Sequence, residues 1–101
     1  MDFVEEKFLK KAIIRGGIHM YNASDAIEVI SMCEQHGWPI FGVDSFSVTE
    51  QQTRPMTEHT LHCSIISSAN GFWYEAKAFV NERASLGYYF EIVYTCNSAL
   101  Y

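Results

Sequence analysis

The spacing of the apolar residues in this 101-residue chain changes around Pro39. Upstream, the apolar residues recur every three or four positions, as in a helix with one buried face; they are Ala26, Val29, Ile30 and Cys33. Gly37 and Pro39 end this pattern, because glycine commonly terminates a helix and proline cannot continue one. Downstream, apolar and polar residues alternate, as they do in strands. The switch predicts an α+β fold in which helices pack against a sheet.

The same patterns predict six elements. The helices are expected over Phe3–Arg15, from a cap at Ser24 to Gly37, and over Phe72–Leu86; the strands over Ile40–Val48, Thr60–Ser67 and Tyr88–Cys96. Gly16 and Gly17 are expected to end the first helix. In the first strand, either Asp44 lies in the apolar phase or a bulge near Gly42–Ser45 shifts the phase. Thr49–Glu58 is expected to be an unusually long polar hairpin loop.

The order helix-helix-strand-strand-helix-strand predicts a split β-α-β arrangement within one domain spanning residues 1–101. A right-handed crossover through the third helix would bring the third strand beside the first. We therefore expect a three-stranded, mostly antiparallel sheet with helices on one face. The opposite face would be partly polar and free to meet a partner; its predicted residues are Thr60, His62, Ser64, Ile66, Tyr89, Glu91, Val93 and Thr95.

Composition narrows the function classes. Hydrophobic residues make up 49% of the chain, enough to form a core, and the net charge is −5. No apolar run approaches the ~20 residues of a membrane span, and no secretory signal peptide is visible. An acidic chain is a poor candidate for binding nucleic acid or anionic membranes and a fair one for binding a basic partner. Cys33, Cys63 and Cys96 are odd in number and lack CxxC spacing, so we expect buried, reduced thiols and a cytoplasmic location.

The histidine-rich segment 58–63 gives little support for a metal site. On a strand, His59 and Cys63 share one face while His62 points to the other, and no third ligand is evident. Nucleophile and phosphate-binding motifs are absent, and the cysteines fall in apolar phases. We therefore expect no metal, no cofactor and no catalytic activity. A small hydrolase or metal-dependent enzyme built on Glu58, His59 and His62 is kept as a third hypothesis.

Acidic residues gather in the predicted hairpin, at Asp44, Glu50 and Glu58, against one Arg54. This region is either a solvated hairpin tip or an acidic projection that docks on a basic protein. Large aromatic residues at the rim of a core are favoured anchors for protein partners. Trp73 and Tyr89 flank the buried stripes, so the predicted partner-binding residues are Asp44, Glu50, Glu58, Trp73 and Tyr89.

The segment Ala26–Val48, with its helix, Gly37 stop and strand containing GVDSF, is followed by Trp73, Phe79-Val80, Arg83 and the strand from Tyr89 to Val93. This order resembles small bacterial immunity proteins of polymorphic toxin and contact-dependent growth inhibition systems, over about residues 24–95. The resemblance implies a non-catalytic cytoplasmic protein that binds and blocks the C-terminal domain of a toxin. Such toxins are commonly nucleases, whose basic clefts an acidic protein would complement.

The main alternative is a small adaptor or regulatory domain. It would bind a peptide or a second copy of itself through the exposed sheet face or edge. The toxin, its substrate, the mode of inhibition and the oligomeric state are left open by the sequence.

Overall fold

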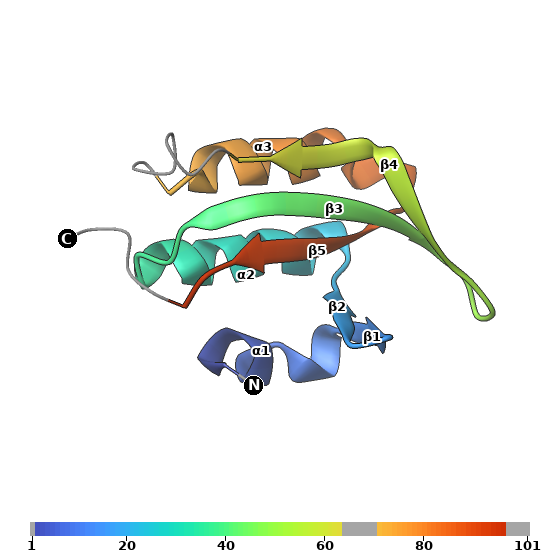
Figure 1. Ribbon diagram of the computed structural model, residues 1–101, viewed down its shortest axis with the longest axis horizontal. Coiled ribbons are helices and arrows are strands. Elements are labelled where there is room, and N and C mark those ends of the chain that lie inside the picture. The colour runs from blue at the N-terminus through green and yellow to red at the C-terminus, as the bar shows by residue number, and fades with distance from the viewer. Residues whose placement is uncertain (1, 64–70, 97–101) are drawn as a thin grey trace.

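A three-stranded antiparallel sheet in the order β4-β3-β5 forms the centre of the fold (Figure 1). Its strands are β3 (Ile40–Val48), β4 (Thr53–His62) and β5 (Tyr89–Tyr94). The structure is a computed structural model that describes residues 2–63 and 71–96. Because β3 is antiparallel to both neighbours, β4 and β5 run parallel to each other, and α3 (Trp73–Glu82) lies between them in sequence. The predicted α+β class and split β-α-β arrangement are confirmed.

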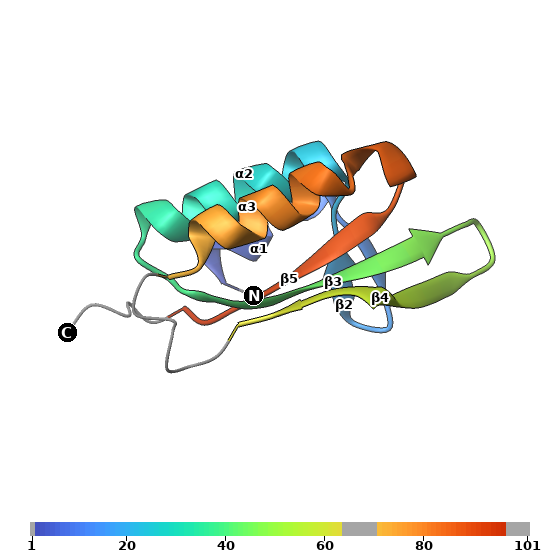
Figure 2. The same ribbon diagram turned by 90° about the horizontal axis from the view of Figure 1, so that it is seen from above.

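Two helices, α2 (Ala23–Gln35) and α3, cover one face of this sheet (Figure 2). The largely aliphatic core lies between these layers; its fully buried residues include Ala26, Val29, Ile30, Cys33, Ile40, Val43, Ala76, Val80 and Phe90. Asn22, not the predicted Ser24, caps α2, because its side chain accepts a hydrogen bond of 2.8 Å from the Asp25 backbone. No helix among the described residues is long and apolar enough to cross a membrane.

The predicted first helix is wrong beyond Lys7. Helix α1 (Phe3–Lys7) is followed by the 3-10 turn η1 (Leu9–Lys11) and by a hairpin of β1 (Ile13–Arg15) and β2 (Ile18–Met20). Gly16 and Gly17 connect these strands with φ values of 57° and 81°. Two successive residues with positive φ form the tight turn that suits a β-hairpin, and glycine adopts this conformation without a Cβ clash. The glycine pair therefore reverses the chain between two strands.

The hairpin of β3 and β4 is longer than predicted and its loop is shorter. Thr49–Glu58 was expected to be a loop, yet β4 already begins at Thr53. Residues 49–52 form a turn closed by a hydrogen bond of 2.8 Å from the Thr49 N–H to the Gln52 carbonyl. The expected irregularity of β3 is confirmed, since its register against β4 shifts between Asp44 and Phe46. The paired strands project past the helices (Figure 1).

The third helix and the last strand are shorter than predicted. Helix α3 stops at Glu82, and the 3-10 turn η3 (Ala84–Leu86) follows it. Leu86, which was expected to be buried, is 50% exposed. Tyr88, Thr95 and Cys96 lie outside β5. The predicted strand positions 64–67, including Ser64 and Ile66 of the expected open face, lie outside the described residues.

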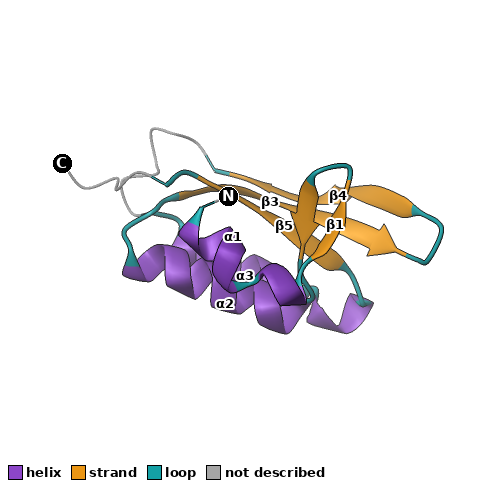
Figure 3. Ribbon diagram, turned by 90° about the horizontal axis from the view of Figure 1, so that it is seen from below, coloured by secondary structure: helices purple, strands orange, loops and turns teal. Residues whose placement is uncertain are grey.

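The β1–β2 hairpin covers part of the sheet face opposite the helices. It crosses the β5 edge (Figure 3), where the backbones of Tyr21 and Phe90 exchange two hydrogen bonds of 2.9 and 2.7 Å. The Arg15 guanidinium donates a hydrogen bond of 3.2 Å to the Gln52 carbonyl at the β3–β4 turn. The rest of this face, which we call the open face, contains Asp44 and Glu91.

Candidate functional site

The three predicted acidic residues do not form one cluster. Asp44 lies at the centre of β3 and pairs with Thr60 on one side and Glu91 on the other. Glu58 is exposed on β4, two residues from Thr60. Glu50 lies in the exposed turn, six residues beyond Asp44, which corresponds to about 20 Å along a strand. The structure therefore brings Asp44 and Glu58 to neighbouring strands and separates Glu50 from them.

The two predicted aromatic anchors lie on different sides of the sheet. Trp73 begins α3 on the helix side, and its indole N–H donates a hydrogen bond of 2.8 Å to the Trp38 carbonyl. Tyr89 pairs with Phe46 at the end of β5, and its side chain is half-buried. Only Tyr89 can therefore contribute to the same surface as Asp44.

A carboxyl pair at the centre of the open face was not predicted as a site. Glu91 lies directly across from Asp44 in the β3–β5 register. Burial and the neighbouring Asp44 charge raise the pKa of the Glu91 carboxyl, and a hydrogen bond with Asp44 acts in the same direction. Alternation of β5 placed Glu91 on this face, but only the register shows that it meets Asp44.

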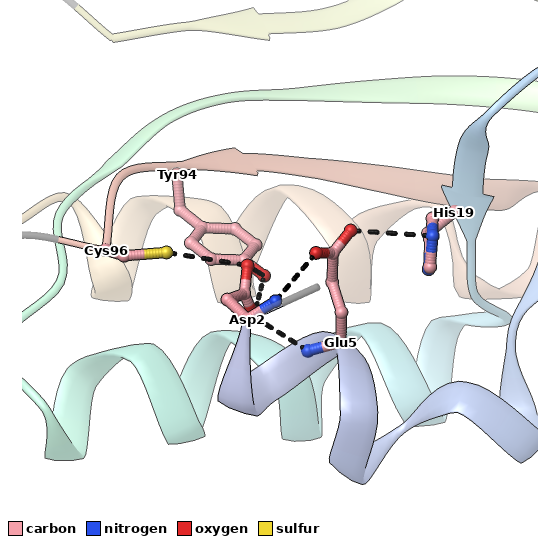
Figure 4. Close-up of polar contacts among 5 residues, drawn as sticks. All are labelled: Asp2, Glu5, His19, Tyr94 and Cys96. Carbon is pink, nitrogen blue, oxygen red and sulfur yellow. Dashed lines mark hydrogen bonds and ion pairs between the residues drawn. The ribbon is translucent and has the colours of Figure 1, made fainter.

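Glu91 also lines a small cleft at the β5 edge, between α1 and β2. The cleft has a volume of about 80 Å³, and its wall includes Glu5, His19, Tyr21, Glu91 and Tyr94. The His19 Nε2 lies 3.5 Å from a Glu5 carboxylate oxygen (Figure 4). The His19 Nδ1 is buried and has no hydrogen-bond partner among the described residues. We call Glu5, His19, Asp44 and Glu91 the acidic cluster.

Next to this cluster, Asp2 connects the N-terminal helix to the end of β5 (Figure 4). Its carboxylate accepts hydrogen bonds from the Glu5 backbone N–H and the Tyr94 hydroxyl, at 2.8 Å each. Although burial acts in the opposite direction, these bonds and one from Cys96 lower the pKa of Asp2. Burial and the bond to Asp2 raise the pKa of Tyr94. A tyrosine that keeps its proton at neutral pH is a structural donor here, not a general base.

Ion pairs neutralise the acidic residues of the helix layer but not those of the acidic cluster. On the helices, three basic residues lie within ion-pair distance of carboxylates; the pairs are Lys11 with Asp25 and Glu28, Lys77 with Glu34, and Arg83 with Glu82. Among the described residues, Glu5, Asp44 and Glu91 have no lysine or arginine within that distance. Much of the uncompensated negative charge therefore lies on the open face and the β5 edge.

The histidines and cysteines are not arranged as an activated nucleophile. His59 Nδ1 accepts a hydrogen bond of 3.1 Å from the Arg83 guanidinium, whereas His62 is exposed. Burial raises the pKa of the Cys33 thiol to about 12 and also raises that of Cys63. A thiol with a raised pKa is a poor nucleophile at neutral pH. In residues 2–63 and 71–96, no three His, Cys, Asp or Glu side chains are grouped closely enough to bind a metal ion.

Comparisons with known proteins add no family. No protein-family model matches the chain, and no curated protein matches it significantly.

Proposed function

We propose that this chain is a non-catalytic immunity protein of the cytoplasm, which binds and neutralises the C-terminal domain of a toxin. The toxin domain would be basic, as expected of a nuclease with a phosphate-binding cleft. The acidic cluster would face that cleft. Complementary charge would speed the encounter and disfavour partners without a basic surface.

The observation that carries this proposal is the Asp44–Glu91 pair. Two carboxyl groups side by side on a half-buried sheet face repel each other when both are ionised, and the raised pKa of Glu91 reflects this. An arginine or lysine from a partner would remove the repulsion and gain charge-assisted hydrogen bonds. A destabilising charge arrangement is typical of binding sites, where function and stability conflict.

The structure changes the set of residues that we propose for the contact. Asp44 and Tyr89 are retained, Glu58 lies close enough to extend the charged area, and Glu5 and Glu91 are added. Glu50 would contact the partner only if the interface reached the hairpin tip.

The experiment measures binding to the toxin domain encoded by the upstream neighbouring gene. Calorimetry should give a tight one-to-one complex, and co-expression of the chain should restore the growth of cells that produce the toxin domain. The double variant Asp44→Asn/Glu91→Gln should weaken binding by about a hundredfold, since each lost charge-assisted contact weakens binding about tenfold or more. Neutral substitutions are chosen because they also remove the repulsion and so favour folding.

The matched control is Glu34→Gln/Glu82→Gln, which makes the same change of net charge on the helix layer. It should bind as the wild type does. Equal weakening by the two double variants would show that only net charge matters and would remove the open face from the proposal. Failure of the wild-type chain to bind or protect would overturn the proposed function itself.

A second candidate function, an adaptor that dimerises or binds a peptide through the open face, is favoured by one observation. Val93 is 39% exposed on this face and lies opposite Gly42, which leaves a flat apolar area beside the acidic cluster. Sedimentation of the free chain separates the two candidates. A concentration-dependent dimer that Val93→Lys abolishes would favour the adaptor.

A further inference from the structure

A second concave site lies on the opposite side of α1 from the acidic cluster's own residues, between the α1–η1 segment and α2. It is a groove of about 290 Å³, close to the lower limit of typical small-molecule pockets. From α2 it takes one helical stripe, which includes Glu28, Ser31 and Met32. The facing wall is formed by Lys7, Phe8 and Lys11.

The groove combines an apolar floor with a basic rim. The Phe8 ring is almost fully buried, and Met32 is half-buried, so these two side chains present apolar surface at the base. Methionine adapts its shape to different ligands. At the rim, Lys11 lies 3.2 Å from Glu28 and 3.8 Å from Asp25, so its charge is compensated.

Lys7 is different from Lys11. No carboxylate among the described residues lies within ion-pair distance of its ammonium group, and its side chain is exposed. The unmatched charge at this groove is therefore positive, in a chain whose net charge is −5. The groove is too small for a helix or a strand pair, and it fits an apolar group of a few carbon atoms.

From this geometry we infer that the groove binds a small amphipathic carboxylate, with its apolar part over Phe8 and Met32 and its carboxylate at Lys7. Ser31 supplies a hydroxyl that can donate a hydrogen bond to the second carboxylate oxygen. This inference does not depend on the proposed function, because the groove shares no residue with the acidic cluster.

The probe for the experiment is hexanoate, observed through the methyl groups of the chain's four methionines labelled with ¹³C. Hexanoate should shift the Met32 methyl signal in a saturable way and leave those of Met20 and Met56, in β2 and β4, unchanged. Hexylammonium, which has the same chain and the opposite charge, should give no saturable shift at Met32.

Two lysine variants test the role of the charge. Lys7→Gln should weaken hexanoate binding by about fivefold, the upper range for one exposed ion pair. Lys77→Gln, which makes the same charge change on α3, should leave it unchanged. The inference is overturned if hexanoate produces no saturable Met32 shift, if hexylammonium binds equally well, or if the two variants weaken binding to the same extent. Unchanged Met20 signals in both variants will show that they are folded.

Discussion

The Tyr94 hydroxyl lies 2.9 and 2.8 Å from the two carboxylate oxygens of Asp2 and donates its hydrogen to that carboxylate, although 92 positions separate the two residues. The contact joins α1 to the end of β5. It also orients Asp2 so that the carboxylate caps the first turn of α1, where a negative charge is favoured by the free backbone N–H groups.

The variant Tyr94→Phe should lower the free energy of unfolding at pH 7 by about 1–3 kcal/mol, because it removes a hydrogen bond to a charged group. The pKa of Asp2 is lowered in the folded state, so this stabilisation is complete above the ordinary value of 3.8 and decreases as the pH falls below it. Urea unfolding at pH 7 and pH 3 measures both effects. Tyr89→Phe is the matched control and should change stability little; equal losses in the two variants would contradict the assignment.

Glu91→Gln should stabilise the chain at pH 7 by about 0.5 kcal/mol, the scale of interactions between partly exposed charges. The pKa of Glu91 is raised in the folded state, so the folded chain binds more protons than the unfolded chain just above pH 4.5. Wild-type stability therefore falls as the pH rises through that window, and the variant should lose this component. Chemical unfolding between pH 4 and 8 tests it, with the exposed Glu58→Gln as control. A variant less stable than the wild type at pH 7 would contradict the expected repulsion.

Gly42→Ala should destabilise the sheet. A Cβ at this position would lie 2.9 Å from the Leu61 carbonyl oxygen, which is backbone on the neighbouring strand and cannot move alone. We expect a loss of about 1–3 kcal/mol, typical of overpacking. Thermal unfolding measures it, with Ser47→Ala on the same strand as control. An unchanged midpoint would mean that β3 and β4 separate here without cost.

The sequence predicted those elements whose signals are local. Strand β3 has the predicted bounds, and α2 ends at the predicted Gly37, because a glycine stop and a change of apolar period are written within a few residues. The β1–β2 hairpin was missed because Ile13 also fits the stripe of a continuing helix. Gly16-Gly17 is compatible with a helix end as well as with a hairpin turn, and only pairing across the turn decides between them.

The site was less predictable than the fold for a related reason. Asp44 and Glu91 were both placed on one face by strand alternation, but their contact depends on the register between strands far apart in the sequence. His19 and Glu5 come together because a hairpin that the sequence did not predict crosses the sheet edge. The role of Trp73 depends on its hydrogen bond to Trp38, which no spacing rule shows.

The three cysteines should differ in reactivity in a way that tests the environment of Asp2. Cys33 and Cys63 are buried, whereas Cys96 is exposed and its thiol donates a hydrogen bond of 3.5 Å to Asp2. Iodoacetamide should modify Cys96 first and reach Cys33 only on unfolding, because the thiolate is the reactive form and needs access. Burial and the Asp2 carboxylate raise the pKa of Cys96, so Asp2→Asn should accelerate its modification at pH 8. Mass spectrometry of timed samples identifies the modified residue, and Cys96→Ser should remove the fast reaction. If Asp2→Asn left the Cys96 rate unchanged, or if Cys33 reacted equally fast in the folded chain, the described geometry around Asp2 and Cys33 would be wrong.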